Sequence, residues 1–456
     1  MGKELFGTDG IRGVAGEYPL DAATVHAFGV ALGRDVIRHE RASQGDVAPE
    51  VLIGADTRES GPWIAELVAR GLESCGVAVR YAGVITTPGI AWLTRTGPFQ
   101  AGVMISASHN PYRDNGIKVF GHSGFKLPDA EEHDIEQEIF QAVQDGASAG
   151  TPAPGAPLAV DESLAGAYLE YLLSTVAVRF EGIRLVVDCG NGAAFRLAPE
   201  LFHRLGASVT TLCADPNGRN INLNCGALHL ESLRQAVLEN HANFGVAFDG
   251  DADRAIFVAA SGKIIDGDAV LLVSARALKA SGRLPGDTVV STVMANLGLE
   301  KALEREGIRM VRTPVGDKYV LEEMVRLGAA LGGEQSGHVI FRQYATTGDG
   351  MLTAVRLFEV ARQSGTGLDE LTADLAIYPQ RLVNVRVREK KGLTEVPVIA
   401  KEIRRVEEAF GTAGRVLVRF SGTEPLARVM VEGPDLERVE KFSASIADII
   451  RREMGA

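Results

Sequence analysis

Three aspartates stand at alternate positions in the segment DGDADR, which runs from Asp249 to Arg254. The segment directly follows the apolar run FGVAF, so its carboxylates come at the end of a predicted buried strand. Three like charges this close repel one another unless a cation neutralises them. A straight strand would hold successive aspartates about 6.6 Å apart, whereas the ligands of one Mg²⁺ lie roughly 3 Å apart. The spacing therefore predicts a loop that curls around a divalent cation; a solvated acidic turn is the alternative.

A second polar loop, ISASHNP, also follows an apolar run, AGVMI. Ligands gather at such carboxyl ends of strands in α/β sheets, which makes Ser108 and His109 candidates for catalysis. A hydrolase is disfavoured because the GxSxG pattern of a nucleophile elbow is absent here and adjacent residues rarely align as nucleophile and base. Nearby Lys118 would either balance the charge of the loop or transfer a proton. Taken alone, the motif also fits an ordinary polar loop.

Two further loops carry polar groups that could bind a ligand. GEQSGH, at Gly333 to His338, offers a carboxylate, a hydroxyl and an imidazole, which hydrogen-bond sugar hydroxyls; a buried turn would look the same. RFSGTEPLAR, at Arg419 to Arg428, combines a glycine turn, two hydroxyls and two guanidiniums, which together form a cradle for phosphate. A surface salt-bridge turn is the alternative for that segment. No Walker A pattern occurs, so this is not a nucleotide P-loop.

The elements that must position these loops follow one repeated plan. Segments beginning near Val51, Ile183 and Thr288 each read as an apolar strand, a polar loop, a helix, a glycine and a second strand. Short apolar runs that alternate with helices are typical of buried, largely parallel strands in α/β layers. The pattern predicts three related α/β domains.

Composition shifts suggest where these domains end. A Gly, Ala and Pro-rich stretch from Gly146 to Pro157 reads as a linker, and a further break is expected near Tyr378. Beyond it the order strand, helix, strand, strand, helix predicts a small α+β domain. The expected domains are residues 1–157, 158–259, 260–377 and 378–456.

The composition excludes several classes of protein. The chain has 456 residues and a net charge of −12, so it lacks the basic surface that nucleic acid or an anionic membrane requires. No apolar run is long enough for a membrane span, and the first residues lack the core of a signal peptide. The four cysteines form no CxxC pair and are too sparse for a disulfide scaffold or a zinc site. A cytoplasmic protein with small-molecule partners is expected.

These four loops, together with FGTDGIRG at Phe6 to Gly13, resemble the α-D-phosphohexomutase superfamily over the whole chain. The resemblance implies four domains around a central cleft, of which three are related α/β domains and the fourth is a small C-terminal α+β domain. It also implies that Ser108 is phosphorylated and that this phosphorylation is required for activity. One Mg²⁺ per subunit would be held by the phosphoserine at Ser108 with Asp249, Asp251 and Asp253.

The resemblance further assigns roles in the cleft. Lys118 and His109 would be catalytic with Ser108, and Lys118 is the first candidate for proton transfer. The substrate would be bound by Arg12, Arg254, Glu334, Ser336, His338, Arg419, Ser421, Gly422, Thr423 and Arg428. Gln335 in GEQSGH is similar to the amino-sugar branch, since phosphomannomutases typically carry Met at that place.

The expected activity is therefore the interconversion of glucosamine 6-phosphate and glucosamine 1-phosphate through a 1,6-bisphosphate, in supply of UDP-N-acetylglucosamine for the cell wall. The main alternative is a mutase of neutral hexose phosphates such as mannose or glucose phosphates. A phosphatase of the haloacid dehalogenase type would need Thr or Val where Asp253 stands in DxDx[TV]. A sugar-phosphate sensor would bind the ligand without turnover of a phosphoserine. The resemblance also allows a homodimer.

Overall fold

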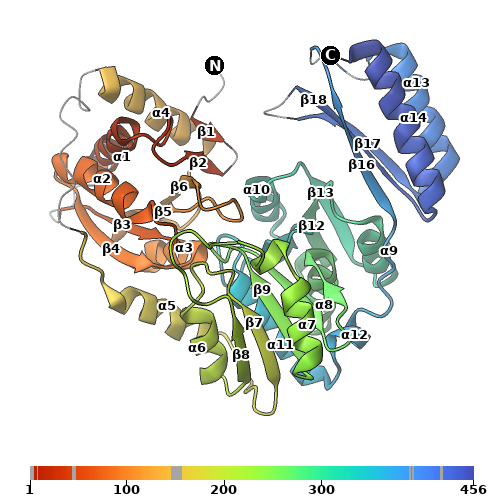
Figure 1. Ribbon diagram of the computed structural model, residues 1–456, viewed down its shortest axis with the longest axis horizontal. Helices are drawn as coiled ribbons and strands as arrows, with labels where there is room; N and C mark the ends of the chain where they lie inside the picture. Colours follow the sequence, from red (N-terminus) through yellow and green to blue (C-terminus); the bar gives the residue numbers. More distant parts are fainter. Residues whose placement is uncertain are drawn as a thin grey trace. The chain divides into compact units, whose positions relative to one another are not determined.

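The computed structural model describes residues 5–7, 9–43, 48–144, 157–389, 392, 395–421 and 425–455 (Figure 1). The chain divides into two compact units. The first unit comprises Met1–Met294 and Ile308–Ala373, and the second comprises Ala295–Gly307 and Asp374–Ala456. Within the described part of the chain, no helix combines the length and apolarity needed to cross a membrane.

The first unit begins with a six-stranded mixed sheet covered on both faces. In spatial order its strands are β1 (Phe6–Gly7), β2 (Gly10–Val14), β6 (Asp114–Gly121), β5 (Phe99–Ile105), β3 (Glu50–Ala55) and β4 (Ala78–Val84). Its helices are α1 (Ala22–Ser43), α2 (Gly61–Ser74), α3 (Thr87–Thr96) and α4 (Asp129–Gln144). Alternate residues of the central strands, such as Val51, Ile53 and Val103, pack with α1, α2 and α4 in one large core, and α3 packs against β5 and β6.

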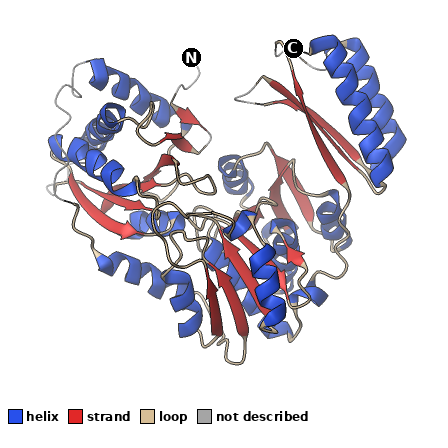
Figure 2. Cartoon of the chain, viewed as in Figure 1, coloured by secondary structure: helices blue, strands red, loops and turns tan. Residues whose placement is uncertain are grey.

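Two more sheets complete the first unit. The second has the order β11 (Ile264–Ile265), β10 (Ala255–Ala259), β9 (Phe244–Phe248), β7 (Arg184–Asp188) and β8 (Ser208–Leu212), with helices α5 (Glu162–Ser174), α6 (Leu197–Arg204) and α7 (Glu231–Glu239). The third has the order β13 (Arg309–Thr313), β12 (Thr288–Thr292), β14 (Leu331–Gly333) and β15 (Val339–Phe341), with helices α8 (Gly267–Ala280), α10 (Asp317–Leu327), α11 (Gly350–Ser364) and α12 (Leu368–Leu371). The strands form separate red layers between blue helices in Figure 2.

The three sheets share one topology, which confirms the predicted repeat. In each, the first strand of the repeat (β3, β7 or β12) is central, the second lies parallel to it on one side, and a third lies parallel to it on the other. A fourth strand then returns antiparallel beside the third (β6, β10 or β15). The buried strands β9 and β12 are apolar or small on both faces, as expected for a sheet covered on each side.

The same turn therefore recurs three times, between the third parallel strand and its antiparallel partner. These turns follow β5, β9 and β14, and they carry the serine, aspartate and GEQSGH loops of the sequence. Equivalent places in three related folds thus hold the three predicted chemical motifs of this unit.

The second unit is a three-stranded antiparallel sheet backed by two long helices. Its strands lie in the order β16 (Gln380–Arg386), β18 (Leu426–Glu432), β17 (Arg415–Phe420), with α13 (Pro397–Phe410) and α14 (Leu436–Met454). The apolar residues of α13 and α14 form one core with Val385, Val429 and Val431 of the sheet. The order strand, helix, strand, strand, helix is confirmed.

Helix α9 (Leu297–Arg305) comes between β12 and β13 in the sequence, as the repeat requires, but its contacts place it in the second unit. The buried carboxylate of Glu432 accepts a hydrogen bond of 2.8 Å from Leu297 N–H and also pairs with Arg415. The N-terminal end of α9 is thus fastened to β17 and β18. The four domain boundaries stay predictions.

Candidate active site

The three loop ends of the first unit bring most of the predicted catalytic residues together. Ser108 Oγ donates a hydrogen bond of 2.6 Å to Asp249 Oδ2. Lys118 Nζ lies 2.9 Å from Asp251 Oδ2 and 3.3 Å from Asp253 Oδ2. His338 Nδ1 lies 3.6 Å from Asp253 Oδ1. Residues more than 200 positions apart in the sequence thus meet at one place, because the three loops follow equivalent strands of the repeat and Lys118 lies on β6, the strand that follows the serine loop.

The serine loop is held from below by a buried arginine. Arg58 is 1% exposed, and its guanidinium donates hydrogen bonds of 2.9 Å to the carbonyl oxygens of Ser108 and Asn110. Asp56 pairs with Arg58 Nε at 2.9 Å and accepts a hydrogen bond of 2.6 Å from Ser106 Oγ. Ser108 itself has a φ of 53°, a left-handed conformation that non-glycine residues rarely adopt. These hydrogen bonds hold the backbone of Ser108 in a strained conformation, as is common at functional sites.

The second sheet supplies another support for the same loop. Asn222 Nδ2 donates a hydrogen bond of 2.9 Å to the carbonyl oxygen of Ser108. Ala193 N–H donates one of 2.8 Å to the carbonyl oxygen of Gly250, between the first two aspartates. A Cβ on Gly192 would lie 2.4 Å from that oxygen, so only glycine allows this approach. The serine and aspartate loops are therefore supported by two segments of the second sheet, which follow β8 and β7 respectively.

The three aspartates form a compact and buried set of oxygen donors. Oxygens of Asp249, Asp251 and Asp253 lie within 4.8 Å of one another, and all three side chains are buried. Burial and the charges of its two aspartate neighbours raise the pKa of Asp249 well above its ordinary value. No described residue donates a hydrogen bond to the buried Asp251 Oδ1. Hard carboxylate oxygens with unused acceptor capacity fit a hard divalent cation such as Mg²⁺.

Lys118 is the principal cation beside this set. Burial acts to lower its pKa, but the charges of Asp251, Asp9 and Asp253 raise it well above its ordinary value. The side chain therefore keeps its proton at neutral pH. A protonated amine can neutralise carboxylates and donate a proton, and it cannot accept one.

A chain of alternating charges continues from Lys118 to the third sheet. Asp9 lies 3.1 Å from Lys118 Nζ and pairs also with Lys126, whose ammonium lies 2.5 Å from Asp317 Oδ2. His338 Nε2 lies 3.7 Å from the same oxygen of Asp317. Through these charged side chains the network links β6 and the turn between β1 and β2 to the start of α10.

His109 and the two arginines lie at the edge of the same site. His109 Nδ1 is 3.3 Å from Ser108 Oγ. Burial and the charges of Arg254 and Arg12 lower the pKa of His109 to about 4, so its ring is neutral at pH 7. Arg12 pairs with Asp9, and the Arg254 Nε lies 3.8 Å from Asp253 Oδ1. Both arginine side chains are partly exposed, which leaves them able to contact an anionic ligand.

In the GEQSGH loop some side chains bond to the fold and others are accessible to solvent. Gln335 Nε2 donates a hydrogen bond of 3.1 Å to Asp266, the residue that caps α8. Glu334 Oε1 accepts one of 3.2 Å from Gly316 N–H and is only half-buried, while Ser336 is exposed. Glu334 and Ser336 therefore remain available to a ligand, and Gln335 positions their loop.

In the second unit, Arg419 and Arg428 are direct partners across β17 and β18. Burial and the charge of Arg428 lower the pKa of Arg419. Arg428 Nη2 also donates a hydrogen bond of 3.4 Å to Ser421 Oγ. Two neighbouring guanidiniums with a hydroxyl form a basic patch that suits phosphate. Gly422 and Thr423 of the predicted cradle lie outside the described residues.

Several supporting residues were not predicted from the sequence: Arg58, Asp56, Asn222, Lys126 and Asp317. One signal was available for the first two, because DTR follows the apolar run VLIGA just as the serine loop follows AGVMI. The others sit in loops and at a helix start with no local pattern, and only the fold brings them to the site.

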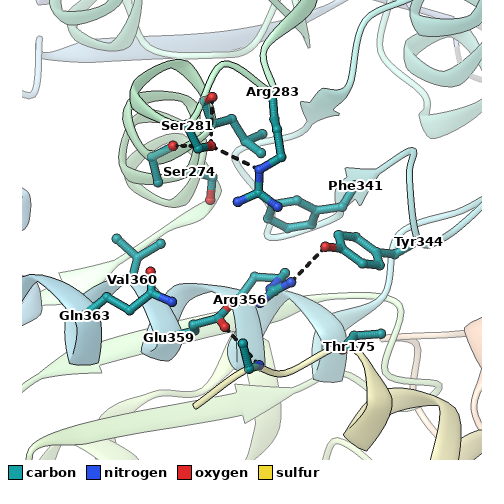
Figure 3. A pocket seen from close by; sticks show the side chains of 13 residues that line it. Thr175, Ser274, Ser281, Arg283, Phe341, Tyr344, Arg356, Glu359, Val360 and Gln363 are labelled. Atoms are coloured by element: carbon teal, nitrogen blue, oxygen red, sulfur yellow. Dashed lines mark hydrogen bonds and ion pairs between the residues drawn. The ribbon is translucent and has the colours of Figure 1, made fainter.

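A cavity of about 290 Å³ lies elsewhere in the first unit, between the end of α5, α8 and α11 (Figure 3). Arg356 lies in it, pairs with Glu359 and donates a hydrogen bond of 3.0 Å to the Tyr344 hydroxyl. Arg283 extends from the other side. None of the loop residues described above lines this cavity, so it is not part of the candidate active site.

Comparison with known proteins agrees with this geometry. Family models of phosphoglucomutase/phosphomannomutase match as alpha/beta/alpha domain I at residues 3–145, domain II at 166–262, domain III at 266–378 and the C-terminal domain at 382–449. The chain is 73% identical to a phosphoglucosamine mutase of Solibacter usitatus, with all of both chains covered. It is 51% identical to one of Koribacter versatilis over 99% of this chain and 98% of the relative.

Solved structures share the fold at lower identity. A phosphoglucomutase/phosphomannomutase family protein of Burkholderia thailandensis matches with a TM-score of 0.78 and 24% identity, covering 98% of this chain and 97% of that one. The N-acetylphosphoglucosamine mutase of Aspergillus fumigatus, solved with GlcNAc-6P and magnesium, matches with a TM-score of 0.64 and 18% identity, covering 98% and 96%. The full-length identities to curated relatives show that the chain belongs to the phosphoglucosamine mutase family of the phosphoglucomutase/phosphomannomutase enzymes.

Proposed function

We propose that the protein interconverts glucosamine 6-phosphate and glucosamine 1-phosphate, with a phosphorylated Ser108 as the phosphoryl carrier. The observation that carries this proposal is the position of Ser108 Oγ, 2.6 Å from Asp249 in a buried set of three carboxylates. A phosphoryl group on that oxygen would stand beside three carboxylates that fit a divalent cation. Asp249, Asp251 and Asp253 would hold Mg²⁺, and the bound ion would supply positive charge that offsets the negative charge of the phosphoryl oxygens.

The chain's own side chains would complete the charge balance. Lys118 carries its proton at neutral pH and offsets the carboxylates while the phosphoryl group is transferred. Arg254 and Arg12 are partly exposed at the edge of the site, where they would contact the phosphoryl group that moves. Such a reaction depends mainly on positioning and electrostatics.

Proton transfer is assigned from geometry and charge state. When Ser108 takes a phosphoryl group from the 1,6-bisphosphate, its hydroxyl must lose a proton. In the structure the Ser108 hydroxyl donates its hydrogen bond to Asp249, which would be a metal ligand during the reaction. We therefore assign His109 as the acceptor, because its Nδ1 lies 3.3 Å from the same oxygen and its ring is neutral at pH 7. In the opposite half-reaction the serine oxygen leaves, and Lys118 or the protonated His109 would return the proton.

The remaining residues that the sequence assigned to binding are proposed to contact the sugar phosphate. Glu334 and Ser336 would hold sugar hydroxyls, with His338 behind them. Arg419, Ser421 and Arg428, with Gly422 and Thr423, would hold the phosphate that does not react. The preference for an amino sugar rests on the family of the chain and on the Gln335 loop.

The sugar phosphates are the proposed partners, and a homodimer stays a prediction. A cytoplasmic location is proposed because that compartment holds the nucleotide-sugar pathway that the product would supply. All four cysteines are free thiols in the structure, as that compartment favours.

The proposal is tested with two serine variants of the same loop. Ser108→Ala should abolish both phosphoserine formation and mutase turnover, because no other loop oxygen occupies that position. Ser106→Ala removes a hydroxyl that bonds Asp56 and should keep the phosphoserine at Ser108, with a lower kcat. Phosphopeptide mapping and conversion of glucosamine 1-phosphate, beside mannose 1-phosphate and glucose 1-phosphate, give the two readouts.

Metal dependence and substrate preference complete the test. Chelation should stop turnover and added Mg²⁺ should restore it. Normal turnover by Ser108→Ala would refute the carrier assignment. A higher kcat/KM for a neutral hexose phosphate would move the enzyme to the alternative substrate class without changing the mechanism.

A further inference from the structure

Two of the four cysteines meet at the end of the second sheet. Cys213 follows β8, Cys225 precedes the short turn Gly226–Leu228, and Asp188 ends β7. A ligand atom from each of these three side chains lies within 4.8 Å of the other two. The sequence suggested four separate thiols, because Cys213 and Cys225 are 12 positions apart and form no CxxC motif. The proposed mutase mechanism uses neither of them.

The two thiols differ in exposure and in chemistry. Cys225 is 1% exposed, whereas Cys213 is partly exposed and follows an edge strand. Cys213 has a φ of 48°, and Asn191 N–H holds its carbonyl oxygen at 2.7 Å. A hydrogen bond from Cys225 lowers the pKa of Cys213, which favours its thiolate. An accessible thiolate beside a buried thiol is the arrangement of an oxidisable pair.

The pair is connected to both active loops through short segments. Asn222, three residues before Cys225, donates hydrogen bonds to the carbonyl oxygens of Ser108 at 2.9 Å and Asn110 at 3.2 Å. Gly226, the next residue after Cys225, packs so closely that a Cβ there would lie 2.6 Å from the carbonyl oxygen of Phe248. Phe248 directly precedes the first aspartate of the metal loop. A shift of residues 222–226 would therefore displace groups that contact the serine loop and the aspartate loop.

We propose that Cys213 and Cys225 form a disulfide when the protein meets a hydroperoxide, and that this modification lowers mutase turnover by displacing Asn222. The sulfur atoms lie within 4.8 Å, while a disulfide needs about 2.05 Å. The sulfurs must approach, and Cys225 lies in a loop segment whereas Cys213 is anchored to a strand. The loop segment that carries Asn222 is the part that moves.

The chemistry balances with hydrogen peroxide as the oxidant. The Cys213 thiolate attacks one peroxide oxygen, so a sulfur–oxygen bond forms, the oxygen–oxygen bond breaks, and hydroxide leaves and is protonated to water. Cys225 then attacks the sulfur of this sulfenic acid. The sulfur–sulfur bond forms, the sulfur–oxygen bond breaks, and a second water leaves with the proton of Cys225. In total the two thiols lose two protons and two electrons, and one peroxide becomes two waters.

A soft-metal site is the other use of such a cluster, and the carboxylate disfavours it. The oxygens of Asp188 already accept hydrogen bonds from Gly190 N–H at 2.8 Å and Gly226 N–H at 3.0 Å. Asp188 therefore fastens two backbone segments. Two thiols and this carboxylate are also one ligand short of a closed structural zinc site, which has four.

The experiment uses the reduced, full-length enzyme and hydrogen peroxide. Trypsin cuts after Arg219, which lies between the two cysteines, so the disulfide joins the peptides 205–219 and 220–234. We expect this linked pair, lighter by two hydrogens than the two free peptides, while Cys75 and Cys189 remain alkylatable. Turnover should fall roughly tenfold or more, as expected for a misplaced reacting group, and dithiothreitol should restore it.

Matched variants separate the pair from general oxidation. Cys213→Ser and Cys225→Ser should each keep their turnover in peroxide, and Cys75→Ser, which removes another partly exposed thiol, should respond as the wild type does. Absence of the linked peptides, unchanged turnover after linkage, or a stoichiometric zinc ion that shields both thiols would overturn the proposal. The activity readout rests on the proposed function. An inactive reduced enzyme would refute that function, whereas the linked peptides test the thiol pair independently.

Discussion

Replacing the buried Arg58 by Met should destabilise the first α/β domain and disorder its serine loop. The guanidinium is enclosed, since the side chain is 1% exposed. It pairs with Asp56 at 2.9 Å and donates hydrogen bonds to the carbonyl oxygens of Ser108, Asn110 and Asp114 at 2.9, 2.9 and 3.0 Å. Met has a similar length and is apolar, so the change removes the charge and the donors while the space stays filled.

The size of the expected loss of stability follows from the Asp56 carboxylate, which Arg58→Met leaves buried without its partner. Burial raises the pKa of Asp56, and Arg58 and the Ser106 hydroxyl oppose this rise. Without Arg58 the acid would take up a proton on folding. Protonating an acid whose unfolded pKa is about 3.9 costs about 1.4 kcal/mol per pH unit, hence about 4 kcal/mol at pH 7. This upper bound agrees with the roughly 3–5 kcal/mol lost when one partner of a buried ion pair is removed.

The pH dependence gives a second, independent expectation. In the variant the folded protein binds a proton at Asp56 that the unfolded chain does not bind above pH 4. Its stability relative to the wild type should therefore rise as the pH falls from 7, by up to about 1.4 kcal/mol per unit, and level off near pH 4. Mutase kcat should fall by about 100-fold, because the carbonyl oxygens that fix Ser108 lose their donors.

Urea unfolding followed by tryptophan fluorescence measures this change where it occurs. The two tryptophans of the chain, Trp63 and Trp92, lie on α2 and α3 of the same domain. Arg326→Met is the control, since Arg326 is exposed in its pair with Glu323 and should leave urea midpoint and kcat unchanged. A loss of stability below about 1 kcal/mol for Arg58→Met, or a loss that does not vary with pH, would refute the reasoning.

Two further predictions test other parts of the structure. Asp349, buried at the start of α11, accepts a hydrogen bond of 2.7 Å from the Tyr168 hydroxyl, and burial raises its pKa from 3.8 to about 6. Ionising Asp349 therefore lowers the free energy of unfolding as the pH rises from 4 to 6. In urea titrations, the free energy of unfolding of Asp349→Asn should rise by about 3 kcal/mol relative to the wild type over that range. Parallel pH profiles of the free energy of unfolding for the two proteins would contradict the assigned pKa. Arg419→Ala should raise KM for the sugar phosphate about tenfold or more with an unchanged thermal midpoint, because a charged donor on the phosphate is lost; an unchanged KM would exclude Arg419 from the phosphate cradle.

The strands and their layers could be predicted because the signal is local. Runs such as IRLVVD and FGVAF are apolar over a strand's length, and the intervening helices make parallel pairing the natural connection. The place of α9 in the second unit could not be predicted. It depends on the buried Glu432, which binds Leu297 N–H from 135 positions away and which reads in the sequence as one more surface glutamate.

Some residues of the candidate active site could likewise be predicted from local sequence, and others could not. DGDADR and the serine loop could be identified as functional from the sequence, since charges and hydroxyls clustered directly after an apolar strand have few structural uses. No local sequence pattern indicates the role of Arg58 or Asn222, although both hold the serine loop, with its left-handed residue Ser108, in place. Their role arises from hydrogen bonds to backbone carbonyls, and these bonds exist only once distant segments are packed together.

The sequence by itself determined the repeated α/β plan, the strand ends that carry reactive groups and the kinds of group that stand there. These depend on the periodicity and residue types of short segments, which act within a few residues. Only the tertiary structure decided that Ser108 faces Asp249, that Lys118 stays charged among three carboxylates, and that Cys213 meets Cys225. Distances, burial and pKa values depend on neighbours that are far apart in the chain, and no local pattern encodes which of them will meet.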